Sequence, residues 1–165
     1  AQPTPDQLQP ISNGGSCLGA KPDGGIWTST YSALYPSGWV RWVESEEFNV
    51  PGVWHAWALQ PDPAARVLVI DSYSELRAVL CNYGMPSPFS NRRAHLLGGI
   101  PDLKPDFERL ARFYDGMRLT EQGQWATRYG EFNLYGWDCE STVWFRWVFT
   151  NVWPVELSAG ISPNK

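Results

Sequence analysis

The sequence has few of the residues that most often build metal and disulfide sites. It contains three cysteines, at Cys17, Cys81 and Cys139, and two histidines, at His55 and His95, among 165 residues. No CxxC pair occurs and neither histidine has a partner at metal-ligand spacing, so the sequence predicts no zinc site. An odd number of widely spaced cysteines gives no disulfide framework. We expect reduced, packed thiols, which suit a reducing compartment such as the cytoplasm.

Several motifs of common enzyme classes are also missing. The sequence has no GxxxxGK loop, no GxGxxG turn and no Gly-x-Ser-x-Gly elbow. These absences remove P-loop nucleotide hydrolysis, the usual dinucleotide fingerprint and serine hydrolysis from the sequence-based hypotheses.

Charge and long apolar runs are limited as well. The net charge is -4 and the pI about 5.1, which argues against a surface that is basic throughout and binds nucleic acid or anionic lipid. No apolar run approaches the roughly 20 residues that span a bilayer, and the polar N-terminus does not resemble a signal peptide, so we expect no membrane partner. With 43% hydrophobic residues, we expect one globular domain over 21–165 after an N-terminal arm over 1–20.

Tryptophan is abundant, at 10 residues. The indole is large and its N–H needs a partner when buried, so some of these rings must fill the core while others can line a cleft. Most of them fall in segments that we predict to be strands: Trp27, Trp39, Trp42, Trp54, Trp57, Trp144 and Trp147.

The pattern of apolar residues predicts an α+β fold. Residues 26–31, 53–59 and 66–70 are rich in β-branched and aromatic side chains and predict strands, the last of them buried. The apolar run 141–149 predicts a central strand, and residues 39–44 fit either a strand or a short helix. We expect a compact mixed or antiparallel sheet.

Two helices complete this prediction. Ser72 and Glu75 have the spacing of a capping box, and Gly84 is a natural stop for the helix that follows them. Phe107, Leu110, Ala111 and Tyr114 recur at i, i+3, i+4 and i+7, which predicts a second helix.

The first candidate functional segment is residues 24–31. Its two glycines permit close backbone approach, and Thr28, Ser29 and Thr30 place hydroxyl groups on both faces of a strand beside Trp27. Such a strand can hold an amide-bearing ligand with ribose hydroxyls. It can equally be an edge strand whose hydroxyls face water.

The second candidate segment is residues 135–142. Asp138 and Glu140 precede the apolar run, and carboxylates at i and i+2 of an extended segment point the same way. A carboxylate at the edge of an aromatic cleft can stabilise a developing cation. The alternative is a pair of ordinary loop carboxylates. A basic stretch over 91–95 and an acidic turn over 44–47 are most simply solvated loops.

The order of these two segments resembles that of a small mono-ADP-ribosyltransferase-like domain, over roughly residues 21–150. In that family a hydroxyl-rich Ser-Thr-Ser type strand braces the nicotinamide side of NAD, and a carboxylate at a late strand contacts the ribose. The resemblance implies a split sheet and NAD as substrate. It places Ser29 in the hydroxyl motif, and it makes Glu140 the acting carboxylate, with Asp138 and Glu131 behind it. The acceptor would be a protein, a nucleic acid or a small molecule.

The resemblance also implies which residues bind NAD, namely Trp27, Thr28, Thr30, Tyr31, Arg41 and His55. The family usually has an arginine or histidine upstream of the hydroxyl motif, and residues 1–20 contain neither. The role then passes to Arg41 or His55, or the fold has lost NAD chemistry.

Two alternatives come from other classes of protein. Exposed tryptophans can form the contact patch of a non-catalytic binding or assembly module. Sugars also stack on indole rings, but carboxylates at i and i+2 are too close to flank a glycosidic bond.

Overall fold

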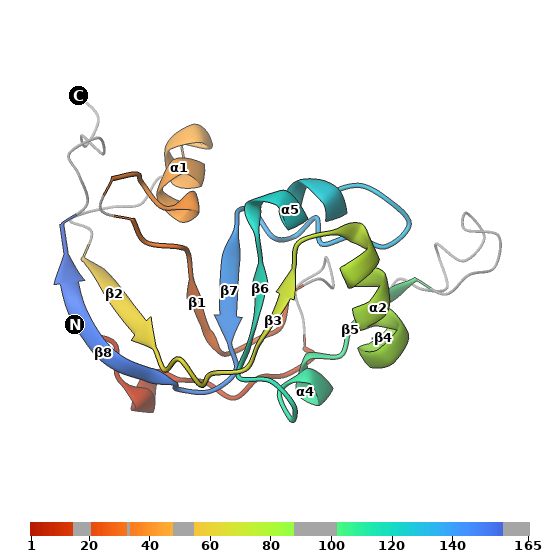
Figure 1. The fold of residues 1–165 in the computed structure, drawn as a ribbon, viewed down its shortest axis with the longest axis horizontal. Helices are drawn as coiled ribbons and strands as arrows, with labels where there is room; N and C mark the ends of the chain where they lie inside the picture. The colour runs from red at the N-terminus through yellow and green to blue at the C-terminus, as the bar shows by residue number, and fades with distance from the viewer. Residues whose placement is uncertain (15–20, 33, 48–54, 88–101, 157–165) are drawn as a thin grey trace.

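Four strands form the central sheet (Figure 1). They are β1 (Ile26–Thr28), β3 (Val67–Ile70), β6 (Gly116–Leu119) and β7 (Ser141–Trp144), in the order β1-β7-β6-β3. Strand β7 pairs antiparallel with both β1 and β6, whereas β3 joins β6 in parallel. The sheet therefore brings a segment near the start of the chain beside one near its end. The computed structural model describes residues 1–14, 21–32, 34–47, 55–87 and 102–156.

The hydrophobic core lies between this sheet and two helices, α2 (Tyr73–Tyr83) and α4 (Phe107–Leu110). Alternation along the strands selects the sheet residues that face it, because successive side chains point to opposite sides. Met117 and Leu119 are fully buried, whereas Arg118 between them is exposed. The buried residues of the core are Ile70, Leu76, Val79, Leu80, Phe107, Leu110, Met117, Leu119, Leu134, Trp137, Val143 and Phe145.

Helix α2 begins and ends where the sequence predicts. The Ser72 hydroxyl accepts a hydrogen bond from the Glu75 backbone N–H at 3.3 Å, and the Glu75 carboxylate accepts one from the Asp71 N–H at 2.6 Å. The reciprocal bond thus reaches one residue further back than in a standard capping box. A Cβ on Gly84 would lie 2.2 Å from the Leu80 carbonyl oxygen, so close approach requires glycine there.

The number of helices differs from the prediction. We expected two main helices, but the described residues form four α-helices, including α1 (Gly38–Ser45) and α5 (Glu121–Thr127). The predicted helix at 107–114 is regular only over Phe107–Leu110, because turns follow it. Helix α5 was missed because its sequence is polar, with only Gly123 and Thr127 buried. No described helix is long and apolar enough to cross a membrane.

The apolar run at 141–149 is not one strand. Strand β7 ends at Trp144, and the chain turns where the Phe145 N–H donates to the Asp115 carbonyl at 2.8 Å. Arg146 also pairs with the Asp115 carboxylate at 3.3 Å. Strand β8 (Phe149–Val155) then pairs with β2 (Ala56–Pro61) in a separate two-stranded sheet. The prediction of a central strand is confirmed for β7 alone.

Two smaller features complete the sheets. Strands β4 (Gly84–Pro86) and β5 (Leu103–Pro105) form a second two-stranded sheet. Strand β3 is at the edge of the central sheet, and only Ile70 of its residues is buried. The expectation of a buried strand at 66–70 is therefore wrong, since no strand of the described residues pairs with its outer edge.

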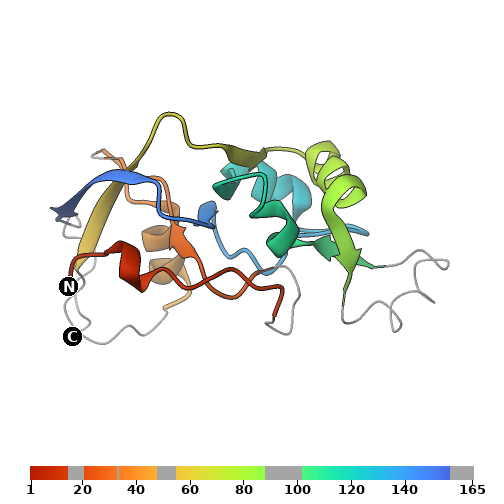
Figure 2. The same ribbon diagram turned by 90° about the horizontal axis from the view of Figure 1, so that it is seen from below.

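The N-terminal segment, which contains the 3-10 helix η1 (Pro5–Gln7), runs along the underside of the molecule (Figure 2). The Gly25 N–H donates to the Gln9 carbonyl at 2.9 Å, and Ser12 forms a β-bridge with Asp23. The Asn13 side chain accepts a hydrogen bond from the Phe107 N–H at 2.7 Å, in addition to the N-cap that Asp106 provides for helix α4. Residues 9–13 are thus tied to both β1 and α4.

Candidate functional site

Glu140 lies against the residues that follow β1. The pairing of Thr28 with Thr142 across β1 and β7 brings Ser29 and Thr30 beside it. Glu140 Oε1 accepts hydrogen bonds from Ser29 Oγ and from the Thr30 backbone N–H, both at 2.7 Å. Glu140 Oε2 accepts one from Thr30 Oγ1 at 3.0 Å. The two segments singled out from the sequence thus meet at a single carboxylate.

These contacts suit an ionised carboxylate. All three come from donors, and a carboxylate is an acceptor with about four positions, two on each oxygen. Ser29 and Thr30 fill both positions on Oε1 of Glu140 and one on Oε2. The second acceptor position on Oε2 has no donor among the described residues. The residue is only 8% exposed, so its charge is partly shielded from water.

The N-terminus of helix α1 packs on the same carboxylate. The Ser37 hydroxyl caps the helix by accepting from the Val40 N–H. The Trp39 N–H, also in the first turn, donates to Ser29 Oγ at 3.1 Å. A Cβ on Gly38 would lie 2.9 Å from Cγ and 3.3 Å from Oε1 of Glu140. Glycine therefore lets the first turn approach the carboxylate closely. The positive end of the helix dipole stabilises its negative charge.

An arginine that the sequence reasoning missed also belongs to the site. Arg118 lies on β6 opposite Thr142, and its Nη2 donates to Thr30 Oγ1 at 3.3 Å. Its place between two core residues, Met117 and Leu119, is the signal that could have marked it as exposed on the other face of a strand. Within the described residues it forms no ion pair.

Asp138 is held apart from this network. Its carboxylate pairs with Lys21 Nζ at 2.6 Å, and both side chains are about one-third exposed. Lys21 also lies 5.7 Å from the centre of the Trp27 ring. Asp138 and Glu140 therefore have different partners, although they are only two residues apart.

Trp27 and Thr28 project from opposite faces of the sheet. The Trp27 ring packs edge-on against the buried Trp137, with ring centres 4.7 Å apart, and so lies on the core side. Thr28 Oγ1 accepts a hydrogen bond from the Trp144 indole N–H at 2.9 Å. Trp27 remains 37% exposed, but on the side of the sheet away from Thr28 and Arg118.

The other predicted NAD-binding residues lie around the site at varying distance. Tyr31 directly follows Thr30 and is exposed. Arg41, on α1, pairs with Glu121 of α5 at 3.4 Å. His55 is exposed at the start of β2, in the separate sheet. Neither Arg41 nor His55 hydrogen-bonds or pairs with Glu140 in the described part of the chain.

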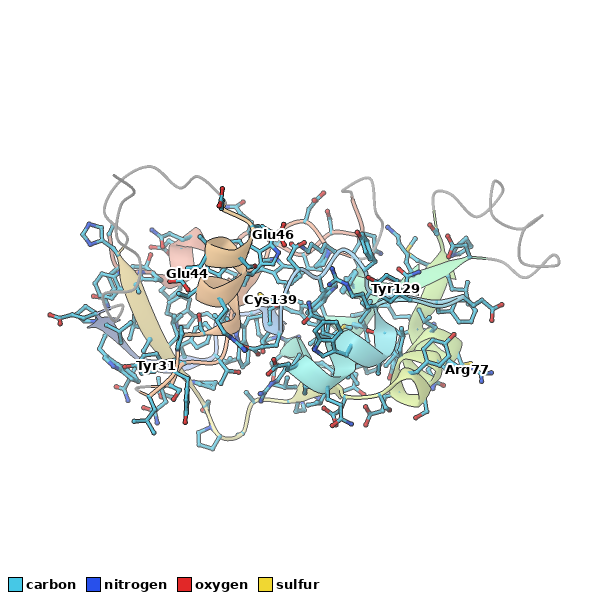
Figure 3. All side chains as sticks on the ribbon, turned by 90° about the horizontal axis from the view of Figure 1, so that it is seen from above. Tyr31, Glu44, Glu46, Arg77, Tyr129 and Cys139 are labelled. Carbon is cyan, nitrogen blue, oxygen red and sulfur yellow. The ribbon has the colours of Figure 1, made fainter. Side chains whose placement is uncertain are left out.

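Cys139 is a buried thiol between the two carboxylates. In the view of Figure 3 it is seen between helix α1, which carries Glu44, and Tyr129. Burial raises the pKa of the Cys139 thiol from 9.0 to about 11, and the charges of Glu140 and Asp138 add to this effect. At neutral pH it is a packed thiol rather than a nucleophile.

The remaining sequence predictions concern cysteines, metals and the basic loop. Cys81 is free and exposed, which corrects the expectation of packed thiols, while Cys139 is free and buried as expected. No group of three metal-ligating side chains occurs among the described residues. Cys17 and the basic stretch at 91–95 lie outside those residues. No protein-family model, curated protein or solved structure matches the chain.

Proposed function

We propose that this chain transfers ADP-ribose from NAD to an acceptor, with Glu140 as the catalytic carboxylate. The observation that carries the proposal is the set of three hydrogen bonds from Ser29 and Thr30 to the Glu140 carboxylate. This is the pairing of a hydroxyl-rich segment with a late glutamate that the resemblance implies. The free acceptor position on Oε2 suits a ribose hydroxyl.

In the proposed reaction Glu140 accepts a hydrogen bond from a ribose hydroxyl of the substrate. Its fixed negative charge stabilises the positive charge that develops on the ribose as the bond to nicotinamide breaks. The electron pair of that bond passes to the nicotinamide nitrogen, which leaves as a neutral ring. The acceptor then forms a bond to the same ribose carbon and loses its proton to solvent.

The aromatic rings nearest Ser29 and Thr30 are candidates for positioning the substrate. Tyr31 and Trp39 are both exposed. Tyr31 follows Thr30 in the sequence, and the Trp39 backbone N–H donates to Ser29 Oγ. Trp27 lies on the core side of the sheet. We therefore assign substrate contact first to Tyr31 and Trp39, and to Trp27 only where its exposed edge can be reached.

The proposal is tested by incubating the protein with labelled NAD and a crude cell lysate. We expect label to appear on an acceptor, and we expect Glu140→Gln to abolish the transfer because the amide cannot supply the charge. Asp138→Asn is the matched control, since Asp138 pairs with Lys21 and has no bond to Ser29 or Thr30. Transfer that survives Glu140→Gln but is lost in Asp138→Asn would move the catalytic role to Asp138.

A second candidate function rests on a cluster of exposed aromatic residues at the end of α5. The Arg128 guanidinium lies 5.9 Å from the Tyr129 ring centre and 5.3 Å from that of Tyr135. Trp125, on α5 and four residues before Tyr129 in the sequence, is 68% exposed. Tryptophan, tyrosine and arginine dominate binding hot spots, so this cluster favours a non-catalytic binding module.

The two functions differ in their response to NAD. A binding module should form a complex, with itself or with a partner, that Trp125→Ala weakens, and its tryptophan emission should not change with NAD. A protein that stays monomeric at high concentration, recovers no partner and changes its emission with NAD would exclude this second function.

A further inference from the structure

The two hydroxyl groups that bind Glu140 are each held by a donor from another element. Ser29 Oγ accepts from the Trp39 N–H at the start of α1, at 3.1 Å. Thr30 Oγ1 accepts from Arg118 Nη2 of β6, at 3.3 Å. A hydroxyl has a single hydrogen, and an N–H pointing at its oxygen directs that hydrogen elsewhere. In both cases the hydrogen is directed to an oxygen of Glu140.

The two donors differ in how firmly they are held. The donor to Ser29 is a backbone N–H fixed by a helix, whereas the donor to Thr30 is a long and exposed side chain. To reach Thr30 from β6, the Arg118 side chain has to cross above Thr142 on β7, the strand between them. Thr142 is buried, in keeping with a side chain lying over it.

In the described part of the chain, Arg118 has no partner that competes with Thr30. The cations Lys21 and Arg41 are each paired with a carboxylate, Asp138 and Glu121 respectively. Within the described residues, the hydrogen bond to Thr30 is the one polar contact of Arg118. Its extended course across the sheet is therefore explained by this bond.

We propose that Arg118 is a positioning residue that acts on Glu140 through the hydroxyl of Thr30. Its guanidinium fixes the Thr30 hydrogen on Oε2, the Glu140 oxygen that keeps one acceptor position free. Without this donor, the Thr30 hydroxyl can rotate toward water, and Oε2 loses the bond that orients its free position. This inference rests on the proposed function at Glu140.

Kinetics separate positioning from substrate binding. In Arg118→Gln we expect kcat for NAD turnover to fall by about tenfold or more, because the hydrogen bond from Thr30 to the charged Glu140 is weakened. We expect KM to be nearly unchanged, because no substrate contact is removed. Arg118→Lys should recover part of kcat, since it keeps the charge and a donor. Arg77→Gln, an exposed arginine on α2, is the control for the loss of one charge.

The relay through Thr30 predicts a dependence between the two residues. In a Thr30→Val background, which lacks the hydroxyl, Arg118→Gln should cause no further loss of kcat, whereas in Thr30→Ser it should act as in the wild type. Equal losses in the Thr30→Val and wild-type backgrounds would overturn the relay. A raised KM with unchanged kcat would also overturn it and would make Arg118 a substrate ligand.

A measurement without NAD keeps the inference testable if the proposed function fails. With 13C-labelled glutamate, the carboxyl signal of Glu140 should shift in Arg118→Gln and should not shift further when Thr30 is already valine. The absence of this pattern would refute the positioning role. If this pattern is found but the wild-type protein does not turn over NAD, the proposed reaction is refuted and the positioning role of Arg118 stands.

Discussion

At the scale of single residues, Glu140 is a charged side chain held in a largely buried place by specific donors. Burying a charge costs free energy unless hydrogen bonds replace the lost water. Here Ser29 and Thr30 provide three of them. Each of these donors should therefore contribute to stability as well as to the orientation of the carboxylate.

Removal of the Ser29 hydroxyl tests this contribution. Ser29→Ala leaves Oε1 of Glu140 with one donor fewer and the Trp39 N–H without its acceptor. We expect it to lower the free energy of unfolding by about 1–3 kcal/mol, measured by urea denaturation. Ser32→Ala is the control, because the exposed Ser32 hydroxyl accepts from the nearby Leu34 N–H and makes no other hydrogen bond with the described residues. Equal effects of the two substitutions would contradict the account.

Cys139 provides a second test at this scale. Burial raises the pKa of its thiol to about 11, so at pH 8 only about one molecule in a thousand carries the reactive thiolate. Cys81 is exposed. We expect iodoacetamide to modify Cys81 in the native protein long before Cys139, with the sites assigned by mass spectrometry. Modification of both at similar rates would mean that Cys139 is not shielded.

At the scale of elements, the start of helix α1 is shaped to fit the carboxylate. Gly38→Ala would place a Cβ 2.9 Å from Cγ of Glu140. We expect it to destabilise the protein by about 1–3 kcal/mol and to impair any reaction at Glu140, because the carboxylate has to move. Arg41→Gln, on the same helix, removes only an exposed ion pair and should cost less than about 1 kcal/mol. A fully stable and active Gly38→Ala protein would show that the helix is not fitted to Glu140.

The N-terminal segment contacts the start of helix α4 through the Asn13 side chain. Asn13 accepts from the Phe107 N–H at 2.7 Å and donates to the Asp106 carboxylate at 2.7 Å. Asn13→Ala leaves the Phe107 N–H at the start of α4 without this acceptor, and we expect a loss of about 1–2 kcal/mol in unfolding free energy. Asn13→Asp should be worse, since it sets a negative charge against Asp106. If neither change affects urea denaturation, the segment does not contribute to the stability of the domain.

At the scale of the whole molecule, local signals in the sequence predicted α+β elements but not their assembly. The capping residue Ser72 and the break at Gly84 bound α2 as expected, because both act through their immediate neighbours. The run at 141–149 was divided by contacts of Phe145 and Arg146 with Asp115, which is distant in sequence. Helix α5 carries too few buried residues for an apolar pattern to reveal it.

The site likewise contains residues that the sequence predicted and residues that it did not. Ser29, Thr30 and Glu140 were predicted as site residues from residue type and order, because hydroxyl groups and a carboxylate can be recognised in the sequence as hydrogen-bonding and charged groups. Arg118 and Gly38 were not, since their roles come from strand pairing and from the packing of a helix end. Sequence alone also could not place Asp138 with Lys21, which are 117 residues apart.

The most direct test of the central claim is the release of free nicotinamide from NAD by the purified protein, with and without lysate as a source of acceptor. We expect time-dependent release by the wild type, a drop of at least about a hundredfold in Glu140→Gln, and little change in Asp138→Asn. No release by the wild type at millimolar NAD, with or without lysate, would contradict it. So would release that persists at the wild-type rate in Glu140→Gln.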